Sequence, residues 1–290
     1  MTHSLVHWMT RPARAAALFA AAALVLAPGT PTALAGGRAV TIKGSDTMVI
    51  LGQRWVERYM ATHPGALLQI TGGGSGTGIA ALINGSTDIC QASREMKPDE
   101  KKKLRDRYQT TGIEIPVARD GLSIYVNEAC PVREFTLEQL RGIYTGKITR
   151  WKELGGPDEP IVVYSRESSS GTYVFFKDHV LGGADFAPQV QTLPGTAAIV
   201  NAVSKDTRGI GYGGVAYAKG IRIPPLKKDA GSPAVAPSEA AVKDGSYALA
   251  RNLYFYTRKK PDGAVKEFID WVLSAEGQKL VTEVGYFPVN

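Results

Sequence analysis

The stretch LLQITGGGSGTG, residues 67–78, sets the pattern for the whole chain. Its Leu- and Ile-rich start predicts a strand, and its glycine-rich end opens directly into a short apolar helix over 79–83. Working outward, VTIKGSDT at 40–47 leads from a strand into a helix over 48–61, and IVVYSRESSSGT at 161–172 leads from a strand into a helix over 173–180. Repeated strand, loop and helix predict an α/β fold with a mainly parallel sheet.

The three loops in these stretches are rich in Ser, Thr and Gly. The first turn of a helix carries backbone N–H groups without an intrahelical partner and the positive end of the helix dipole. Gly lets the backbone approach an anion closely, and hydroxyl groups add donors. One such loop is most often an ordinary helix cap, but three at strand exits predict one shared anion site. The three loops are Gly44-Ser45-Asp46-Thr47, Gly74-Ser75-Gly76-Thr77 and Ser170-Gly171-Thr172.

Two charged residues narrow the class of anion. Arg166 lies four residues before Ser170, and its planar guanidinium can donate to two oxygens of a tetrahedral anion at once. Asp88 falls near the end of a predicted strand over 87–90. An ionised carboxylate only accepts hydrogen bonds, so it would accept one from a protonated phosphate oxygen and would repel fully ionised sulfate. Outside this pattern, Arg166 would be a solvated surface group and Asp88 a cap.

The glycine-rich loop lacks the signature of a nucleotide site, and the chain lacks those of hydrolase and metal sites. The glycine cluster at 72–78 does not match G-x-G-x-x-G, and neither G-x-x-x-x-G-K-[ST] nor G-x-S-x-G occurs in the chain. After residue 35 only two histidines remain, His63 and His179, and no group of His, Cys and acidic residues has metal-ligand spacing. We therefore expect no cofactor, no metal and no enzymatic activity, with a phosphoryl-transfer or hydrolytic enzyme as the rival class.

The N-terminus has the order of a secretory signal peptide. Arg11 and Arg14 precede an apolar run over 15–27, and residues 33–35 supply an A-x-A cleavage site. The run is shorter than the roughly 20 apolar residues of a membrane-spanning helix, although a retained anchor is the alternative. We expect a cleaved signal over 1–35, no lipid anchor because no Cys directly follows the run, and a secreted, periplasmic protein.

The remaining chain is basic without the pattern of a nucleic-acid-binding protein. The formal net charge is +7, and loss of residues 1–35, which hold two Arg and no acidic residue, lowers it to +5. Lysines cluster only at 101–103, 227–228 and 259–260, without interleaved aromatic residues. Such runs are typical of solvated faces, so the basic excess favours a small anionic ligand over nucleic acid.

Two cysteines remain, Cys90 and Cys130. An oxidising compartment permits a disulfide between them, and spare thiols are uncommon there. The sequence does not show whether their Cα atoms come within about 7 Å of each other, so the bridged and the free forms both stay open.

Four further elements complete the predicted order. A strand over 122–127 is followed by an amphipathic helix over 137–144, with Thr136 as its N-cap. A strand over 253–256 precedes a helix over 265–273, which is predicted to end the fold.

Together these motifs resemble the periplasmic phosphate-binding proteins of bacterial phosphate ABC transporters, the PstS type. The resemblance covers the whole chain after residue 35. It rests on the loops at 44–47, 74–78 and 166–172, the segment 88–94 and the stretch LARNLY at 249–254. The spacing from Arg166 to Ser170-Gly171-Thr172 is its most specific part.

The resemblance implies two hinged α/β lobes, each a mainly parallel sheet flanked by helices, that close over one dehydrated phosphate. Lobe 1 would hold residues 36–125 and 219–290, and lobe 2 residues 126–218. Ser45, Thr47, Ser75 and Asp88 would bind from the first lobe, and Arg166, Ser170, Gly171 and Thr172 from the second. Ser93 and Arg94 would be neighbours of the site, with Arg94 either near the ligand or paired with Asp88.

The implied function is capture of inorganic phosphate and its delivery, by a monomer, to the membrane permease of an ABC importer. Binding of sulfate, molybdate or phosphonate is the alternative, because these oxyanions suit the same helix starts. A secreted phosphate-ester hydrolase is the second alternative.

Overall fold

The chain forms a mixed eight-stranded sheet in the part that the computed structural model describes, residues 38–290. The predicted signal peptide over 1–35 lies outside these residues. Along the sheet the strands follow the order β2-β1-β3-β10-β4-β8-β6-β7, and β5 pairs with β9 separately. Their bounds are β1 (Val40–Gly44), β2 (Leu68–Thr71), β3 (Ile89–Ala92), β4 (Ile113–Val126), β5 (Phe135–Thr136), β6 (Val162–Arg166), β7 (Gln191–Leu193), β8 (Gly209–Gly214), β9 (Leu226–Lys227) and β10 (Ala250–Thr257).

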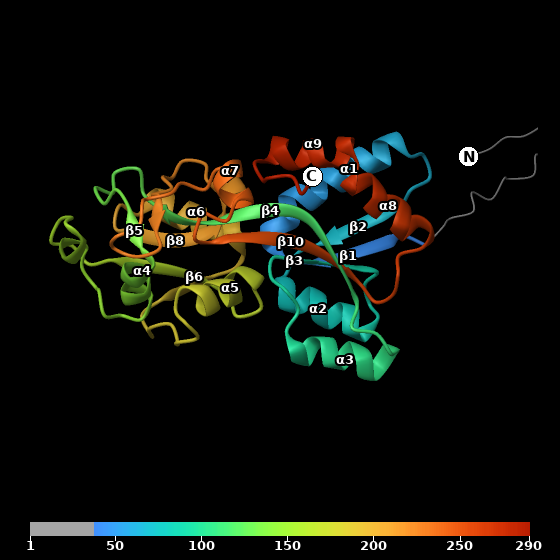
Figure 1. Ribbon diagram of the computed structural model, residues 1–290, viewed down its shortest axis with the longest axis horizontal. Helices are drawn as coiled ribbons and strands as arrows, with labels where there is room; N and C mark the ends of the chain where they lie inside the picture. Colours follow the sequence, from blue (N-terminus) through green and yellow to red (C-terminus); the bar gives the residue numbers. More distant parts are fainter. Residues whose placement is uncertain (1–37) are drawn as a thin grey trace, which may run out of the picture. The chain divides into compact units, whose positions relative to one another are not determined.

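Helices flank this sheet (Figure 1). They are α1 (Val49–Thr62), α2 (Ser75–Asn84), α3 (Pro98–Tyr108), α4 (Leu137–Tyr144), α5 (Gly171–His179), α6 (Gly195–Lys205), α7 (Glu239–Lys243), α8 (Gly263–Leu273) and α9 (Ala275–Val284). Short 3-10 turns are η1 (Asp46–Met48), η2 (Trp151–Leu154) and η3 (Val215–Tyr217).

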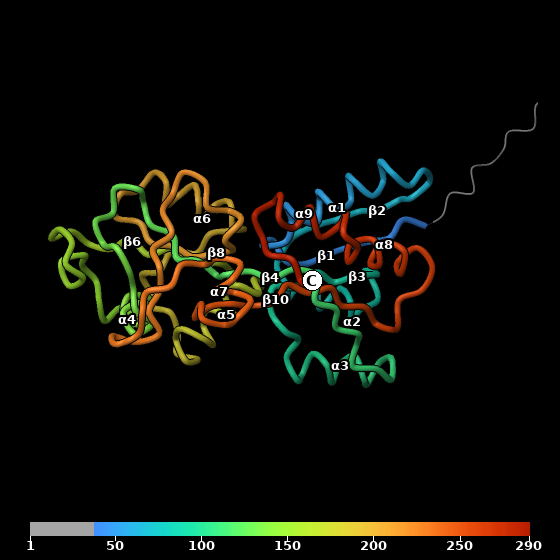
Figure 2. The backbone as a smooth tube through the Cα atoms, turned by 45° about the horizontal axis from the view of Figure 1, so that its top comes forward, coloured from blue at the N-terminus to red at the C-terminus, as the bar shows by residue number. Residues whose placement is uncertain are grey.

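Two antiparallel strands in the middle of the sheet separate two mainly parallel halves. In the first half, β1 pairs in parallel with β2 and β3, and in the second half β6 pairs in parallel with β7 and β8. Between them, β10 and β4 run antiparallel to each other and to their outer neighbours β3 and β8. Figures 1 and 2 show both strands passing from one half to the other. The predicted α/β fold with mainly parallel strands is confirmed within each half.

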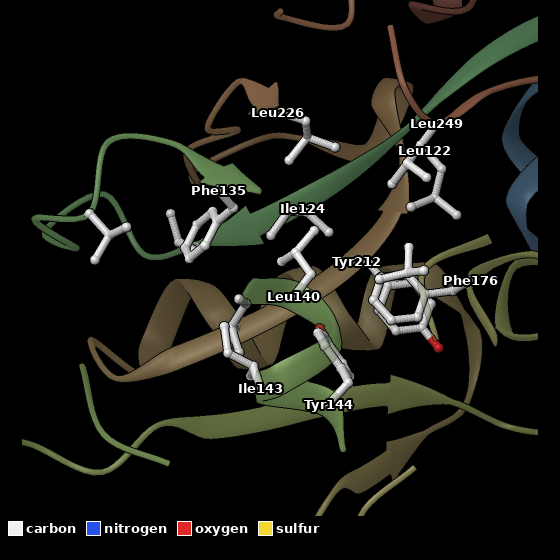
Figure 3. Close-up of a cluster of buried hydrophobic side chains, with 14 of the residues drawn as sticks. Leu122, Ile124, Phe135, Leu140, Ile143, Tyr144, Phe176, Tyr212, Leu226 and Leu249 are labelled. Atoms are coloured by element: carbon white, nitrogen blue, oxygen red, sulfur yellow. The ribbon is translucent and has the colours of Figure 1, made fainter. Parts of the chain in front are cut away.

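Each half buries its own apolar clusters. In the second half Ile124, Leu140, Phe176 and Tyr212 pack together beneath β4 and β8 (Figure 3). In the first half Trp55 of α1 packs in a cluster that also contains residues of β10 and α8, and its indole N–H donates to the Gly277 carbonyl at 2.8 Å. Burial of apolar side chains, at about 25 cal/mol per Å², therefore holds the helices to the sheet within each half.

The segment over 219–249 packs with the second half. Leu226 of β9, Ala241 and Val242 of α7, and Tyr247 all belong to the same buried cluster as Ile124. The lobe limits predicted from the resemblance, at 125 and 218, stay a prediction that is taken up under Proposed function.

The strand β4 is longer than the strand predicted over 122–127, because it begins at Ile113. The sequence does not predict this extension because it contains Pro116. Proline lacks the backbone N–H that donates to a neighbouring strand, so it argues against a central strand. The register between β10 and β4 shifts beside Pro116, between Leu253 and Tyr254, and such an irregularity is where a sheet tolerates proline.

The sequence pattern does not predict α3 or α9. In α3 only Leu104 is buried, so the helix has no apolar periodicity to detect. The prediction that the helix over 265–273 ends the fold is wrong, because α9 begins directly after Ser274, whose hydroxyl accepts from Gly277 N at 3.4 Å. The predicted cap of α4 is confirmed, since Thr136 Oγ1 accepts from Gln139 N at 3.1 Å.

Cys90 and Cys130 are both buried and unpaired. Cys90 lies in β3 and packs in a first-half cluster with Ile79 and Leu104, whereas Cys130 packs in the second-half cluster. The disulfide that the sequence left open is therefore not formed, because the two thiols lie in separate clusters.

Both thiols should react when the protein is unfolded without reductant. Alkylation with iodoacetamide in denaturant, followed by intact-mass measurement, should add two adducts, one each at Cys90 and Cys130. In the folded protein the reaction should be slow, since burial raises the pKa of the Cys90 thiol and the thiolate is the reactive form. Protein that stays unmodified in denaturant, but reacts after reduction, would contradict the free state.

Candidate functional site

Loops from both halves meet where β1, β2, β3 and β6 end. In the first half β1 leads through Ser45 into η1 and α1, β2 leads through three glycines into α2, and β3 leads into Ser93. In the second half β6 ends at Arg166 and leads to α5, with Ser170 as the N-cap residue. The carboxyl ends of parallel strands form the ligand crevice of α/β sheets, and here two such edges share one place.

A chain of hydroxyl groups joins the two halves. Thr47 Oγ1 lies 2.7 Å from Thr172 Oγ1, and Ser93 Oγ lies 3.4 Å from the same atom. Ser75 Oγ lies 3.3 Å from Ser93 Oγ and accepts from Ser93 N at 3.0 Å. All four side chains are at most 1% exposed, so these hydroxyl groups are shielded from bulk solvent.

The backbones of two loops also touch across the halves. Gly76 N, at the start of α2, donates to Ser169 O at 2.9 Å. At Gly74, with φ +93°, a side-chain Cβ would lie 2.5 Å from Ser169 O, and at Gly171 a Cβ would clash with Ser75 Oγ. Only glycine permits these approaches. Of the predicted candidates, residues 45–47, 75–76, 93, 166 and 170–172 thus lie together.

Arg166 is buried between the halves, with 1% of its side chain exposed. Its Nη2 donates to Asp46 at 3.0 Å and to Glu167 at 2.9 Å, its Nε donates to Glu167 at 3.1 Å, and its Nη1 donates to Thr196 Oγ1 at 2.8 Å. A guanidinium has five N–H donors. From the sequence we expect the Arg166 guanidinium to donate to two oxygens of an anion. In the structure, four of its five N–H groups donate to protein acceptors, and one N–H group on Nη1 is left.

Asp46 contacts the second half through two groups and its own half through a third. Its Oδ1 accepts from Gly73 N at 2.8 Å, its Oδ2 accepts from Arg166, and its backbone carbonyl accepts from Tyr217 OH at 2.6 Å. Burial raises the pKa of Tyr217 to about 12, so this hydroxyl keeps its proton at neutral pH.

Asp88 does not join this cluster. It precedes β3, which begins at Ile89, instead of ending the strand as predicted. Its carboxylate accepts from Thr41 N and Thr41 Oγ1, both at 2.9 Å, and pairs with Arg38 at 2.9 Å. These contacts lie at the amino end of β1, whereas Ser45 follows the carboxyl end of the same strand. The predicted position of Asp88 was therefore wrong, and the carboxylates found beside Arg166 are those of Asp46 and Glu167.

Arg94 pairs with Glu100 of α3 and not with Asp88. Its Nη1 and Nη2 donate to the two Glu100 oxygens at 2.8 and 2.7 Å, and Nη1 also donates to Glu95 O at 2.8 Å. Such a bidentate pair fixes the exit of β3 against α3.

The sequence reasoning missed a second buried arginine at this place. Arg251 of β10 pairs with Asp120 of β4 at 2.7 Å and donates to Thr172 Oγ1 at 3.1 Å. LARNLY was interpreted only as a strand, although a charged residue inside an otherwise apolar strand was the available signal, since buried charges are paired.

Ser45 is 1% exposed, and its Oγ has no hydrogen-bond partner among residues 38–290. An unpaired buried hydroxyl costs about 1–3 kcal/mol unless a bound group pairs with it. This orphaned hydroxyl immediately precedes η1, beside the residues that join the halves.

Neither a metal cluster nor a membrane helix is found within residues 38–290. No group of three His, Cys, Asp or Glu residues there is arranged to hold an ion. None of the helices in that range is long and apolar enough to cross a bilayer.

Comparison with known families gives one consistent result. Residues 28–276 match the family profile described as a PBP superfamily domain. The chain is 34% identical over 263 residues to the phosphate-binding protein PstS of Pseudomonas aeruginosa, covering 85% of this chain and 81% of that protein. It is 35% identical over 260 residues to PstS of Staphylococcus epidermidis, covering 84% and 77%.

Solved structures agree with the sequence matches. A Clostridium perfringens protein with bound phosphate superposes with a TM-score of 0.78 and 31% identity, over 87% of this chain and all of the other. An ABC-type phosphate transport receptor from Vibrio cholerae gives a TM-score of 0.70 and 31% identity, over 86% of this chain and 99% of the receptor.

The carboxyl group of Glu167 makes the site sensitive to acid. Burial alone would raise its pKa, but the hydrogen bonds and the positive charge of Arg166 outweigh burial, so the pKa of Glu167 is lowered. A carboxyl group with a lowered folded-state pKa stabilises the protein above its unfolded pKa of about 4.3. This stabilisation is lost as pH falls through the folded-state value.

Glu167→Gln should lower the free energy of unfolding at neutral pH by about 1–3 kcal/mol, because a charge-assisted bond to Arg166 is lost. The difference from the original protein should shrink as pH falls from about 5 toward 3. Urea unfolding across that range measures both effects. Glu128→Gln, at an exposed position, is the control and should change neither. A difference that stays constant with pH would show that the Glu167 charge is not involved.

Proposed function

Because the chain belongs to the PstS family of phosphate-binding proteins, within the PBP superfamily, we propose that it captures inorganic phosphate in its interlobe cluster and delivers it to an ABC importer. Members of this family are substrate-binding proteins of transporters and not enzymes. The fold is the family's two-lobed one, in which lobes of mainly parallel sheet and flanking helices are joined by a hinge.

The convergence of helix starts carries the proposal. The starts of η1, α2 and α5 come from both sides of the molecule and meet in one buried cluster, linked by the contact between Thr47 and Thr172. The first N–H groups of each helix lack intrahelical partners and are electropositive. A tetrahedral oxyanion supplies acceptors in several directions, so it suits such a place better than a neutral ligand does.

Two side chains support a direct contact with the anion. Arg166 keeps one Nη1 donor beyond its contacts with Asp46, Glu167 and Thr196, and Ser45 Oγ has no partner among the described residues. We infer that Ser45, Thr47, Ser75, Arg166, Ser170, Gly171 and Thr172 bind phosphate, with Gly76 and Ser93 holding the loops in place. Asp88 and Arg94 are left out because their polar contacts lie with Thr41 and Glu100.

Asp46 supplies the proton-sensing role predicted for Asp88. Its oxygens accept from Gly73 N and Arg166, and each retains a second lone pair. A carboxylate beside the bound anion accepts the proton of hydrogen phosphate, whereas sulfate has no proton to donate. The same carboxylate then disfavours sulfate through charge repulsion.

The packing supports lobe limits that differ from those predicted. Leu226, Val242 and Tyr247 share a buried cluster with Ile124, while Leu253 packs with the first half. We propose that the chain leaves the first lobe along β4 at about residue 120 and returns along β10 at about residue 250.

We further propose that the protein acts outside the cytoplasmic membrane after removal of residues 1–35, as a monomer whose closed form docks on the membrane permease. The order of charged, apolar and small residues in that segment supports export. Lobe closure would give the permease a surface that differs between the loaded and empty forms.

Titration calorimetry on protein that has been unfolded and refolded to remove carried ligand tests the proposal. Ser45→Ala should weaken phosphate binding by about 1–3 kcal/mol. It should not destabilise the ligand-free protein, since Ser45 Oγ has no partner in the described chain. Arg166→Ala should weaken binding by about 2–5 kcal/mol. Ser204→Ala, at an exposed position of α6, is the control.

A ligand panel separates the alternatives. Tighter binding of sulfate, molybdate or a phosphonate than of phosphate would replace the proposed ligand. Release of phosphate from a phosphate ester would instead favour a hydrolase. Unchanged phosphate affinity in both Ser45→Ala and Arg166→Ala would move the site elsewhere.

Asp46→Asn should let sulfate compete with phosphate at least about tenfold better, because the repelling carboxylate is gone. Competition calorimetry with sulfate measures this ratio. Glu167→Gln is the matched control, since it also removes a carboxylate that pairs with Arg166. Equal relaxation in both variants would assign selectivity to overall charge and not to Asp46.

A further inference from the structure

Arg251 and Asp120 face each other on the two strands that connect the halves. They are register partners in the β10–β4 ladder, and their side chains are 3% and 0% exposed. Arg251 Nε and Nη2 donate to the same Asp120 oxygen at 3.0 and 2.7 Å. The pair is therefore anchored on the segment that any hinge motion must pass through.

From this anchor the guanidinium reaches both sides of the binding cluster. Its Nη1 donates to Ser93 O at 3.1 Å, in the first half, and its Nη2 donates to Thr172 Oγ1 at 3.1 Å, in the second half. Its plane also lies over the ring of Phe175 in α5, 5.2 Å from the ring centre. Asp120 Oδ1 accepts from Val215 N at 3.0 Å, just past the end of β8.

These bonds require the two halves to be close together. Ser93 and Thr172 belong to different halves, so a movement that separates them must break at least one bond of Arg251. A buried charge that loses a partner pays a desolvation cost that exposed charges do not pay. The pair therefore favours the arrangement in which both halves contact Arg251.

Arg251 also fixes which way the Thr172 hydroxyl points. A guanidinium donates and never accepts, so Thr172 Oγ1 must accept from it. The single proton of Thr172 is then directed away from Arg251, toward Thr47 Oγ1, Ser93 Oγ or an anion among them. An anion needs hydrogen-bond donors. Because the Thr172 oxygen accepts from Arg251, its O–H group points away from Arg251 and can donate to the anion.

We propose that Arg251, held by Asp120, is a positioning residue that locks the closed form and orients Thr172 as a donor to phosphate. This inference rests on the proposed function for its ligand, but the lock itself is a property of the protein. Arg251 also lines a cavity of about 500 Å³ that it shares with Arg94, Phe175 and Tyr254.

Stopped-flow tryptophan fluorescence tests the lock through the rates of phosphate binding and release. Arg251→Met should raise the release rate about tenfold or more and change the association rate little, because affinity differences among variants lie mostly in release. Arg251→Lys keeps the charge but cannot donate to Ser93 and Thr172 from two nitrogens. Its release rate should lie between those of the original protein and Arg251→Met. Arg119→Met is the control: it lies on β4 beside Asp120, its side chain donates to Pro288 O, and it should leave both rates unchanged.

A double-variant comparison separates positioning from general damage. If Arg251 acts through Thr172, Arg251→Met should have little further effect on release in a Thr172→Val background. Full additivity of the two changes, or an unchanged release rate in Arg251→Met, would overturn the proposal. Should Arg251→Met fail to fold, the same comparison is made with Arg251→Lys.

Small-angle scattering keeps this test independent of the ligand. Without phosphate, Arg251→Lys and Asp120→Asn should have a larger radius of gyration than the original protein and the Arg119→Met control. If the original protein did not bind phosphate, the proposed function would fail while this measurement still decided the lock. An unchanged radius in both variants would overturn the lock even if phosphate binds.

Discussion

The hydrogen bond between the Thr47 and Thr172 hydroxyls is the contact on which the rest of the site depends. It is 2.7 Å long, fully buried, and joins the first turn after β1 to the first turn of α5. Because it lies between two halves with separate apolar clusters, it exists only when both halves present their helix starts to one place. The contacts from Gly76 to Ser169 and from Arg166 to Asp46 join the same two sets of helix starts.

Three buried arginines lie on the segments that converge here, and each is paired with a carboxylate. Arg94 pairs with Glu100, Arg166 with Asp46 and Glu167, and Arg251 with Asp120. Their formal charges are therefore already balanced by the protein. In the proposed function, the attraction for phosphate would then come from the amide groups of the helix starts and from the few donors left over, which have direction as well as polarity. We propose that such donors select an anion by its proton and its shape.

The middle of the sheet is where the two halves could move relative to each other while each stays rigid. Among the strands of residues 38–290, β4 and β10 alone run through both halves, and each half has an apolar cluster of its own. A hinge at these strands costs few apolar contacts, whereas a change within either half would open a packed core. Arg251 and Asp120 sit on these two strands, and Arg251 bonds both Ser93 of one half and Thr172 of the other.

The sequence by itself determined the α/β class, the cap of α4 at Thr136 and the three Ser-, Thr- and Gly-rich helix starts, because these follow from residues close together in the chain. It missed α3, whose single buried residue leaves no periodicity, and the first part of β4, which contains Pro116. Only the tertiary structure decided that Asp88 lies at the amino ends of β1 and β3, that Asp46 meets Arg166, that Arg251 reaches Thr172, and that Cys90 and Cys130 stay apart. The physical reason is that partners of buried charges and thiols are chosen by strand order and register, which bring together residues more than a hundred positions apart, as in the 131-residue separation of Arg251 and Asp120.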